Sequence, residues 1–146
     1  MAKGLHGVIR LHKWTVDEKR RALGQLLQRE EEILRFQRLL QEELLREQTL
    51  ARQDVTLAMA FGQYLKLYSR RRDALAQALV EVRQRIDAAR QDLAEAFLDL
   101  KTYELTQASR DRQEKLERDR KEQAMLDEIG LTLHRRREQQ RRDGGF

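Results

Sequence analysis

The sequence predicts an all-α protein, a long antiparallel two-helix coiled-coil hairpin with an overhanging C-terminal helix. Charged residues make up 38% of the 146 residues and proline is absent, a composition typical of long helices and coiled coils. Alternating β-branched segments bounded by turn residues do not occur, so nothing predicts strands. Apolar residues recur at alternating steps of three and four along two segments of equal length, which places them on one stripe of a helix.

The first segment runs from Ile9 to Ala51, and eight of its thirteen stripe positions are apolar. Leu27, Leu34 and Leu45 widen the stripe beside it. The stripe positions are Ile9, His12, Val16, Lys19, Leu23, Leu26, Glu30, Ile33, Gln37, Leu40, Leu44, Glu47 and Ala51. Residues 1–8 contain two glycines and little periodicity. We therefore expect a loose arm before a first helix at about 9–52.

The second segment has the more regular stripe, which only Arg72 interrupts. Its positions are Phe61, Leu65, Tyr68, Arg72, Leu75, Leu79, Val82, Ile86, Ala89, Leu93, Ala96, Leu100 and Tyr103. Both segments span 43 residues, so a chain folded about Thr56 would set Ile9 beside Tyr103 and Ala51 beside Phe61. We expect a turn at about 53–60, with Asp54 or Thr56 as N-cap, and a second helix at about 61–140. Residues 1–146 would then form a single hairpin.

A second arrangement fits the periodicity. The first stripe continues through Asp54 and Ala58 to Phe61 without a change of phase, and neither glycine nor proline marks a turn between the segments. A single long helix that dimerises in parallel is therefore compatible with the pattern. The equal lengths of the two segments favour the hairpin.

After Tyr103 the next stripe positions are polar, beginning with Gln107 and Arg110. This segment instead carries six opposite-charge pairs at i,i+4, each of which stabilises a helix by about 0.2–0.5 kcal/mol. The pairs are Arg110–Glu114, Asp111–Lys115, Glu114–Arg118, Lys115–Asp119, Glu117–Lys121 and Arg118–Glu122. The second helix is therefore expected to overrun the first.

Apolar residues return near the C-terminus, and a basic cluster follows them. The apolar residues are Met125, Leu126, Ile129 and Leu133, and the cluster is Arg135, Arg136, Arg137, Arg141 and Arg142. Either the N-terminal arm, with Leu5 and Val8, covers the apolar residues, or they form a docking surface for another protein. The 30 basic and 25 acidic residues are interleaved along the chain, which favours a solvated basic tail over a nucleic-acid site.

The sequence offers no catalytic constellation. A glycine-rich phosphate loop of the GxxxxGK type is absent, and His6, His12 and His134 have no partner at metal-ligand spacing. We therefore expect no enzyme, no cofactor and no metal. With no run of about 18 apolar residues, a soluble or peripheral protein is expected. The only tryptophan, Trp14, is expected to pack near Phe97 or Tyr103, with a role as partner anchor as the alternative.

Three segments resemble the flagellar export protein FliJ, most closely its α-proteobacterial members. They are RLHKWTVDEKRR at 10–21, AFGQYLKLYSRRRDALAQAL at 60–79 and EAFLDLKTYEL at 95–105. A QAxLDE-like segment at 123–128 adds to the resemblance. The resemblance implies an antiparallel coiled coil without enzymatic activity in the flagellar type III export apparatus. It would contact the export ATPase hexamer, the export gate membrane protein and export chaperones, in the cytoplasm at the inner face of the cell membrane.

The resemblance also suggests where the partners bind. The expected ATPase-binding residues lie near the C-terminus: Met125, Leu126, Ile129, Leu133, Arg135, Arg136 and Arg137. The expected gate-binding residues lie toward the turn: Phe61, Tyr64, Tyr68 and Arg72. Membrane association would occur through these partners only, and no nucleic acid is expected. The alternative function is a parallel dimeric coiled-coil adaptor or scaffold.

Overall fold

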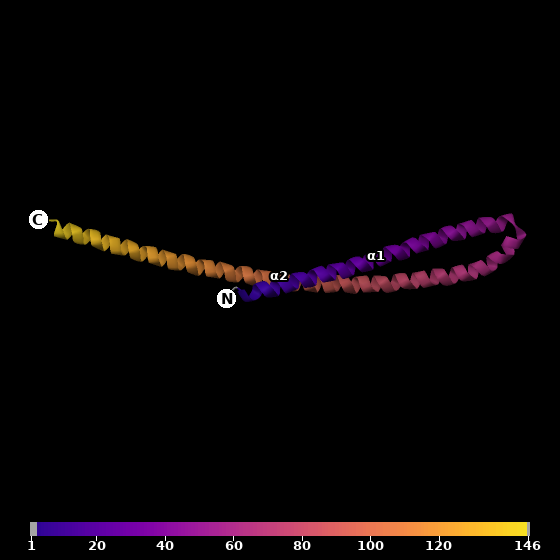
Figure 1. The fold of residues 1–146 in the computed structure, drawn as a ribbon, viewed down its shortest axis with the longest axis horizontal. Helices are drawn as coiled ribbons and strands as arrows, with labels where there is room; N and C mark the ends of the chain where they lie inside the picture. Colours follow the sequence, from indigo (N-terminus) through magenta and orange to yellow (C-terminus); the bar gives the residue numbers. More distant parts are fainter. Residues whose placement is uncertain (1–2, 146) are drawn as a thin grey trace. The chain divides into compact units, whose positions relative to one another are not determined.

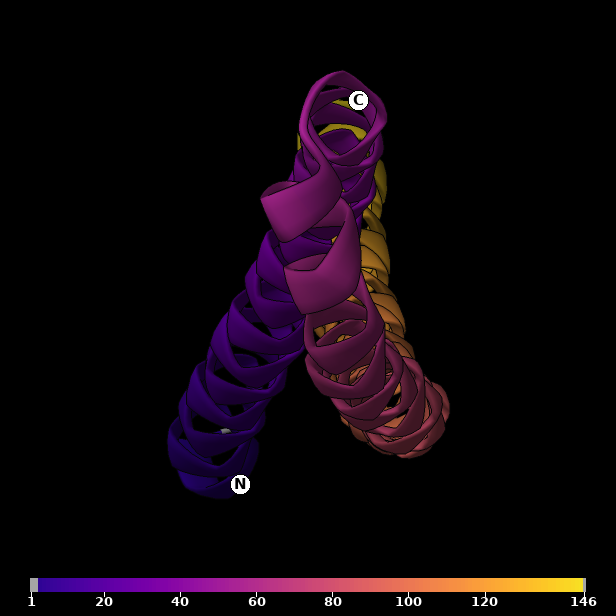
Figure 2. The same cartoon turned by 90° about the vertical axis from the view of Figure 1, so that its right-hand side faces the viewer.

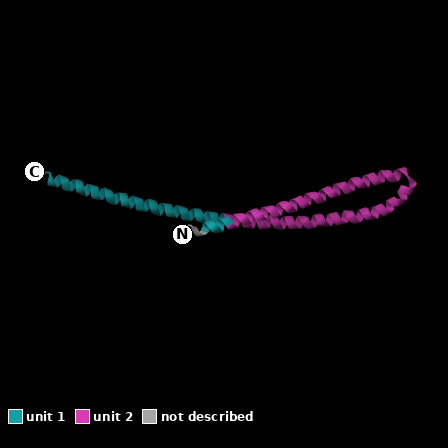
Figure 3. Cartoon of the chain, in the orientation of Figure 1, with its two compact units in different colours: residues 1–10, 101–146 teal, residues 11–100 magenta. Residues whose placement is uncertain are grey.

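The computed structural model describes residues 3–145 and contains two long helices, α1 (Lys3–Gln53) and α2 (Val55–Asp143) (Figure 1). No strand occurs in the described range, so the predicted all-α class is confirmed. The chain divides into two compact units (Figure 3). We call residues 11–100 the hairpin unit, and residues 1–10 with 101–146 the terminal unit.

In the hairpin unit, α1 and α2 run antiparallel (Figures 1 and 2). Burial of the stripe positions shows that the helices pack through the predicted stripes. Ile33, Val82 and Ile86 form the central cluster, which the partly buried Leu23, Leu26, Leu75, Ala78 and Leu79 surround. All thirteen positions of the first stripe are buried or partly buried, whereas Leu65 and Arg72 of the second are exposed. The predicted hairpin is therefore confirmed.

Three ion pairs join α1 to α2 and agree with the register expected from a turn near Thr56. Lys19 Nζ lies 4.0 Å from Asp92 Oδ2, Arg83 Nε lies 3.1 Å from Glu30 Oε2, and Arg71 Nη1 lies 3.7 Å from Glu43 Oε1. Such solvent-accessible pairs contribute about 0–1 kcal/mol each. Because they match opposite charges on antiparallel helices, they favour the hairpin over the parallel dimer.

The turn is shorter than expected. Asp54 is the single non-helical residue between the helices, and it caps α2: its Oδ1 accepts a hydrogen bond from the Thr56 backbone N–H at 2.8 Å. Its backbone carbonyl accepts the N–H of Ala58 at 2.9 Å. Residues 55–60, assigned to the turn from the sequence, are the first turns of α2. They contain no glycine or proline, and alanine, leucine and methionine among them favour helix.

In the terminal unit, the expected loose arm is helical from Lys3 onward, whereas residues 1 and 2 lie outside the described range. Gly7 costs this helix up to about 1 kcal/mol relative to alanine. Packing offsets that cost, because Leu5, Val8 and Ile9 are partly buried. The pairing also reaches one stripe position beyond the expected end at Tyr103, since Gln107 is only 5% exposed. From Arg110 to Gly145 every side chain is exposed, although α2 continues to Asp143.

Candidate functional site

The four residues expected to contact the gate lie together at the start of α2. Steps of three and four residues place them on one face of the helix. The Phe61 and Tyr64 ring centroids are 5.9 Å apart with 21° between the ring planes, and those of Tyr64 and Tyr68 are 6.4 Å apart with 32° between planes. The Arg72 guanidinium lies 5.9 Å from the Tyr68 ring centroid, within cation–π range. We call these four residues the aromatic ladder.

Arg72 occupies a position of the second stripe, yet its side chain is exposed. A guanidinium is too costly to bury without a partner of opposite charge. It therefore lies over Tyr68, and its Nε is 3.3 Å from Asp73 Oδ1. The stripe consequently lacks an apolar side chain at this point of the hairpin unit.

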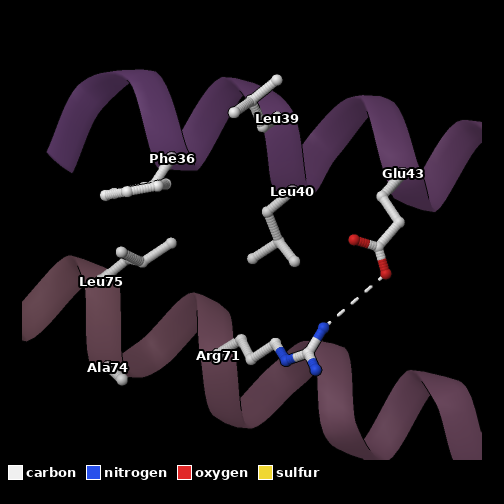
Figure 4. A pocket seen from close by; sticks show the side chains of 7 residues that line it. All are labelled: Phe36, Leu39, Leu40, Glu43, Arg71, Ala74 and Leu75. Atoms are coloured by element: carbon white, nitrogen blue, oxygen red, sulfur yellow. Dashed lines mark ion pairs between the residues drawn. The ribbon is translucent and has the colours of Figure 1, made fainter. Parts of the chain in front are cut away.

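An apolar groove lies between the helices next to this interruption (Figure 4). Its lining residues come from both helices: Phe36, Leu39, Leu40 and Glu43 from α1, and Arg71, Ala74 and Leu75 from α2. Figure 4 shows Leu40 and Leu75 pointing into the space between the helices, with the Glu43–Arg71 ion pair at one end. Such a groove can receive an apolar side chain of a partner, and its two charged lining residues, Glu43 and Arg71, are paired with each other.

Tyr64 links the ladder to the acidic residues of α1. Burial raises the pKa of Tyr64 above its usual value of 10.0, and the negative charges of Glu43 and Glu47 raise it further. The hydroxyl oxygen is buried and makes no well-aligned hydrogen bond to the described residues. Burial and the neighbouring carboxylates thus disfavour the ionised form of this phenol.

The residues expected to contact the ATPase lie in the terminal unit. Met125, Leu126, Ile129 and Leu133 are 49–61% exposed, so the interpretation in which Leu5 and Val8 cover them is wrong. Arg135, Arg136 and Arg137 are also exposed. A shallow groove on this single helix groups four of the seven expected residues, and it is lined by Met125, Glu128, Ile129, Thr132, Leu133 and Arg136. Leu126, Arg135 and Arg137 lie outside the groove lining.

Trp14 does not pack as expected. The exposed fraction of Trp14 is 59%, and that of Leu11, three residues earlier, is 61%. Trp14 lies midway between the stripe positions His12 and Val16, so it faces away from α2. The expectation that Trp14 packs at the foot of the hairpin is wrong, and its exposure is compatible with the alternative role as an anchor.

The described residues contain neither a candidate metal site nor a candidate membrane span. Among them, no group of three or more histidine, cysteine, aspartate or glutamate side chains could hold a metal ion. His134 Nε2 lies 3.3 Å from Glu138 Oε1 in a local i,i+4 contact. Neither helix, within the range searched, has a segment apolar and long enough to span a bilayer.

Comparison with known proteins identifies the family. The model of the family described as flagellar FliJ protein matches residues 1–139. No curated protein and no solved structure matches the chain. The match includes all of α1 and most of α2, and the antiparallel hairpin agrees with the fold that the three similar segments imply. Its role is therefore related to flagellar protein export, and the chain belongs to the flagellar FliJ family.

Proposed function

We propose that this protein is a non-enzymatic component of the flagellar export apparatus that couples the export ATPase to the export gate and to export chaperones. It acts in the cytoplasm and reaches the inner face of the cell membrane through these partners. One observation carries the ATPase assignment: α2 continues as helix to Asp143 while every side chain from Arg110 onward is exposed. A helix of this length without a partner in its own chain is suited to docking in the ATPase hexamer.

The chemistry of the C-terminal segment supports this docking. The exposed Met125, Ile129 and Leu133 follow one another at steps of four, so they present one apolar face. The arginines that follow would meet acidic side chains of the ATPase ring, and such charge complementarity gives specificity and fast association. A short apolar face followed by positive charge would hold the helix without deep burial.

The aromatic ladder supports the gate assignment. Three neighbouring rings, of which Phe61 and Tyr64 are stacked and Tyr68 is tilted against Tyr64, and one guanidinium follow one another along α2 near the turn. Aromatic and arginine side chains are enriched among residues that dominate binding energy. The ladder lies in the hairpin unit and the ATPase-binding residues lie in the terminal unit, so the two partners use different parts of the chain.

Deletion of residues 124–146 tests the ATPase assignment. We expect loss of binding to the purified export ATPase, measured by calorimetric titration, with the helical circular dichroism of the hairpin retained. Undiminished binding by the truncated protein would refute C-terminal docking.

A charge-matched pair of variants sharpens the test. Arg136→Gln with Arg137→Gln is expected to weaken ATPase binding at least tenfold, since one close charge pair at an interface contributes about 1.5 kcal/mol or more. Arg112→Gln with Arg120→Gln removes the same charge from the exposed helix upstream and is expected to leave binding unchanged. Equal losses in both double variants would indicate non-specific attraction.

A further inference from the structure

A buried polar side chain lies where the pairing of the two helices ends. Gln107 occupies the stripe position after Tyr103 and is only 5% exposed. It belongs to the terminal unit, which joins residues 1–10 to residues 101–146. We call the described residues 3–10 of this unit the arm. The register that sets Ile9 beside Tyr103 also sets Leu5 beside Gln107, so the arm covers this glutamine.

The carboxamide of Gln107 is only half satisfied. Its Nε2 donates a hydrogen bond to Asp111 Oδ1 at 2.8 Å, whereas its Oε1 is buried and accepts no hydrogen bond from the described residues. The bond to Asp111 also fixes the orientation, because a turned carboxamide would bring Oε1 against a carboxylate oxygen. A buried oxygen that loses water without gaining another donor destabilises the state that buries it. Here that state is the closed pairing of the arm with α2.

The arm contributes little that offsets this loss. Its apolar residues Leu5, Val8 and Ile9 are only partly buried, whereas the central cluster of the hairpin unit is 1–5% exposed. Gly7 lies within the arm, and glycine has a low helix propensity. Helices shorter than about 12–15 residues are marginal without packing. The arm therefore loses its helical structure readily once its contacts with α2 are broken.

We propose that the pairing between the arm and residues 101–107 opens while the hairpin unit stays folded, and that the buried Gln107 sets the population of this open state. Opening returns the Gln107 oxygen to water and releases Gly7 from the helix, and it exposes only the partly buried apolar surface of the arm. In the open state α2 has no partner in its own chain from Lys101 onward. The inference goes beyond the proposed function, which uses the exposed helix from Arg110 onward.

Native-state hydrogen exchange of the full-length chain tests the proposal, because amides in a segment that opens separately exchange faster than those in the core. The amides of Val8 and Ile9 report on the arm, and the amide of Val82 reports on the hairpin unit. Gln107→Leu removes the unsatisfied oxygen and adds apolar surface at the buried position. Gln113→Leu makes the same change at an exposed position of the same helix and is the matched control.

In the wild type we expect the arm amides to exchange faster than the Val82 amide. Gln107→Leu should slow exchange of the arm amides about tenfold or more, as expected when a buried unsatisfied group is removed, and should leave Val82 unchanged. Gln113→Leu should change neither rate. Gly7→Ala is a second probe and should slow the arm amides about fivefold through helix propensity. Its added Cβ would meet no packed neighbour within 4 Å in the described range.

Three results would overturn the proposal. Arm amides that exchange only as fast as the Val82 amide would show that the arm does not open separately. Equal exchange of the arm amides in the wild type and in Gln107→Leu would show that Gln107 does not set the opening. Equal slowing by Gln107→Leu and Gln113→Leu would assign the effect to a general gain in helix propensity.

Discussion

Replacement of Ile33 by alanine should destabilise the hairpin unit strongly, because Ile33 is the most deeply buried side chain, at 1% exposure. The change removes three carbon groups, each worth about 0.8 kcal/mol when buried. A cavity beside Val82 and Ile86 adds to this loss, and buried isoleucine-to-alanine changes cost about 2–5 kcal/mol overall. Two helices can close partly around the cavity, so we expect the free energy of unfolding to fall by about 3 kcal/mol.

Native-state hydrogen exchange in increasing urea measures this loss within the hairpin, since the amides of Val82 and Ile86 exchange only when it opens. Circular dichroism would also report the exposed helix beyond Arg110. With a urea dependence of about 1.5 kcal/mol/M, the midpoint should fall by about 2 M. Leu45→Ala, at a side chain 59% exposed, should change stability by less than about 0.5 kcal/mol. Equal shifts for both variants would refute the assignment of Ile33 to the core.

Three other changes have defined outcomes. Ile86→Asp places an unpaired charge in the core and should unfold most of the hairpin at 25 °C; an unchanged thermal melt would show that Ile86 is not buried. Asp54→Ala removes the cap of α2 and should cost about 1 kcal/mol in urea denaturation, whereas Asp54→Asn should cost much less. The pKa of Tyr64 is raised in the folded protein. The stability that the wild type has from its protonated phenol is therefore fully present below about pH 10 and is lost as the pH rises through the folded-state pKa. Tyr64→Phe should therefore lose less stability than the wild type above pH 10 in chemical denaturation, and a parallel loss would refute the assignment.

The stripes could be predicted from sequence because two long helices have few ways to bury apolar surface. Polar stripe residues such as Glu30 are partly buried as the periodicity requires, and their ion pairs with the opposite helix explain why they are tolerated. The turn could not be located as well, because Asp54 alone reverses the chain and leaves no cluster of turn-forming residues. The helical arm before Ile9 was missed because Gly4 and Gly7 lower local helix propensity, while packing sets the outcome.

The candidate surfaces were predictable to different degrees. Spacing along one helix was sufficient to place Tyr64, Tyr68 and Arg72 on one face, and the structure brings them together. The groove beside them combines Phe36 from α1 with Ala74 from α2, and it could be found only after the register between the helices was known. The feature of the sequence that points to this groove is Arg72, which interrupts an otherwise apolar stripe.

The polar residues that weaken the first stripe also determine the direction in which the helices pair. In a parallel in-register dimer, Lys19 and Glu30 would each face the same residue of the other copy, and Arg72 would face another arginine, which is unfavourable. In the hairpin, Lys19 faces Asp92 and Glu30 faces Arg83. Each pair contributes little stability by itself, but the difference between attraction and repulsion accumulates along the seam. The polar stripe residues thus reduce the apolar surface that the hairpin buries, and they define its antiparallel register.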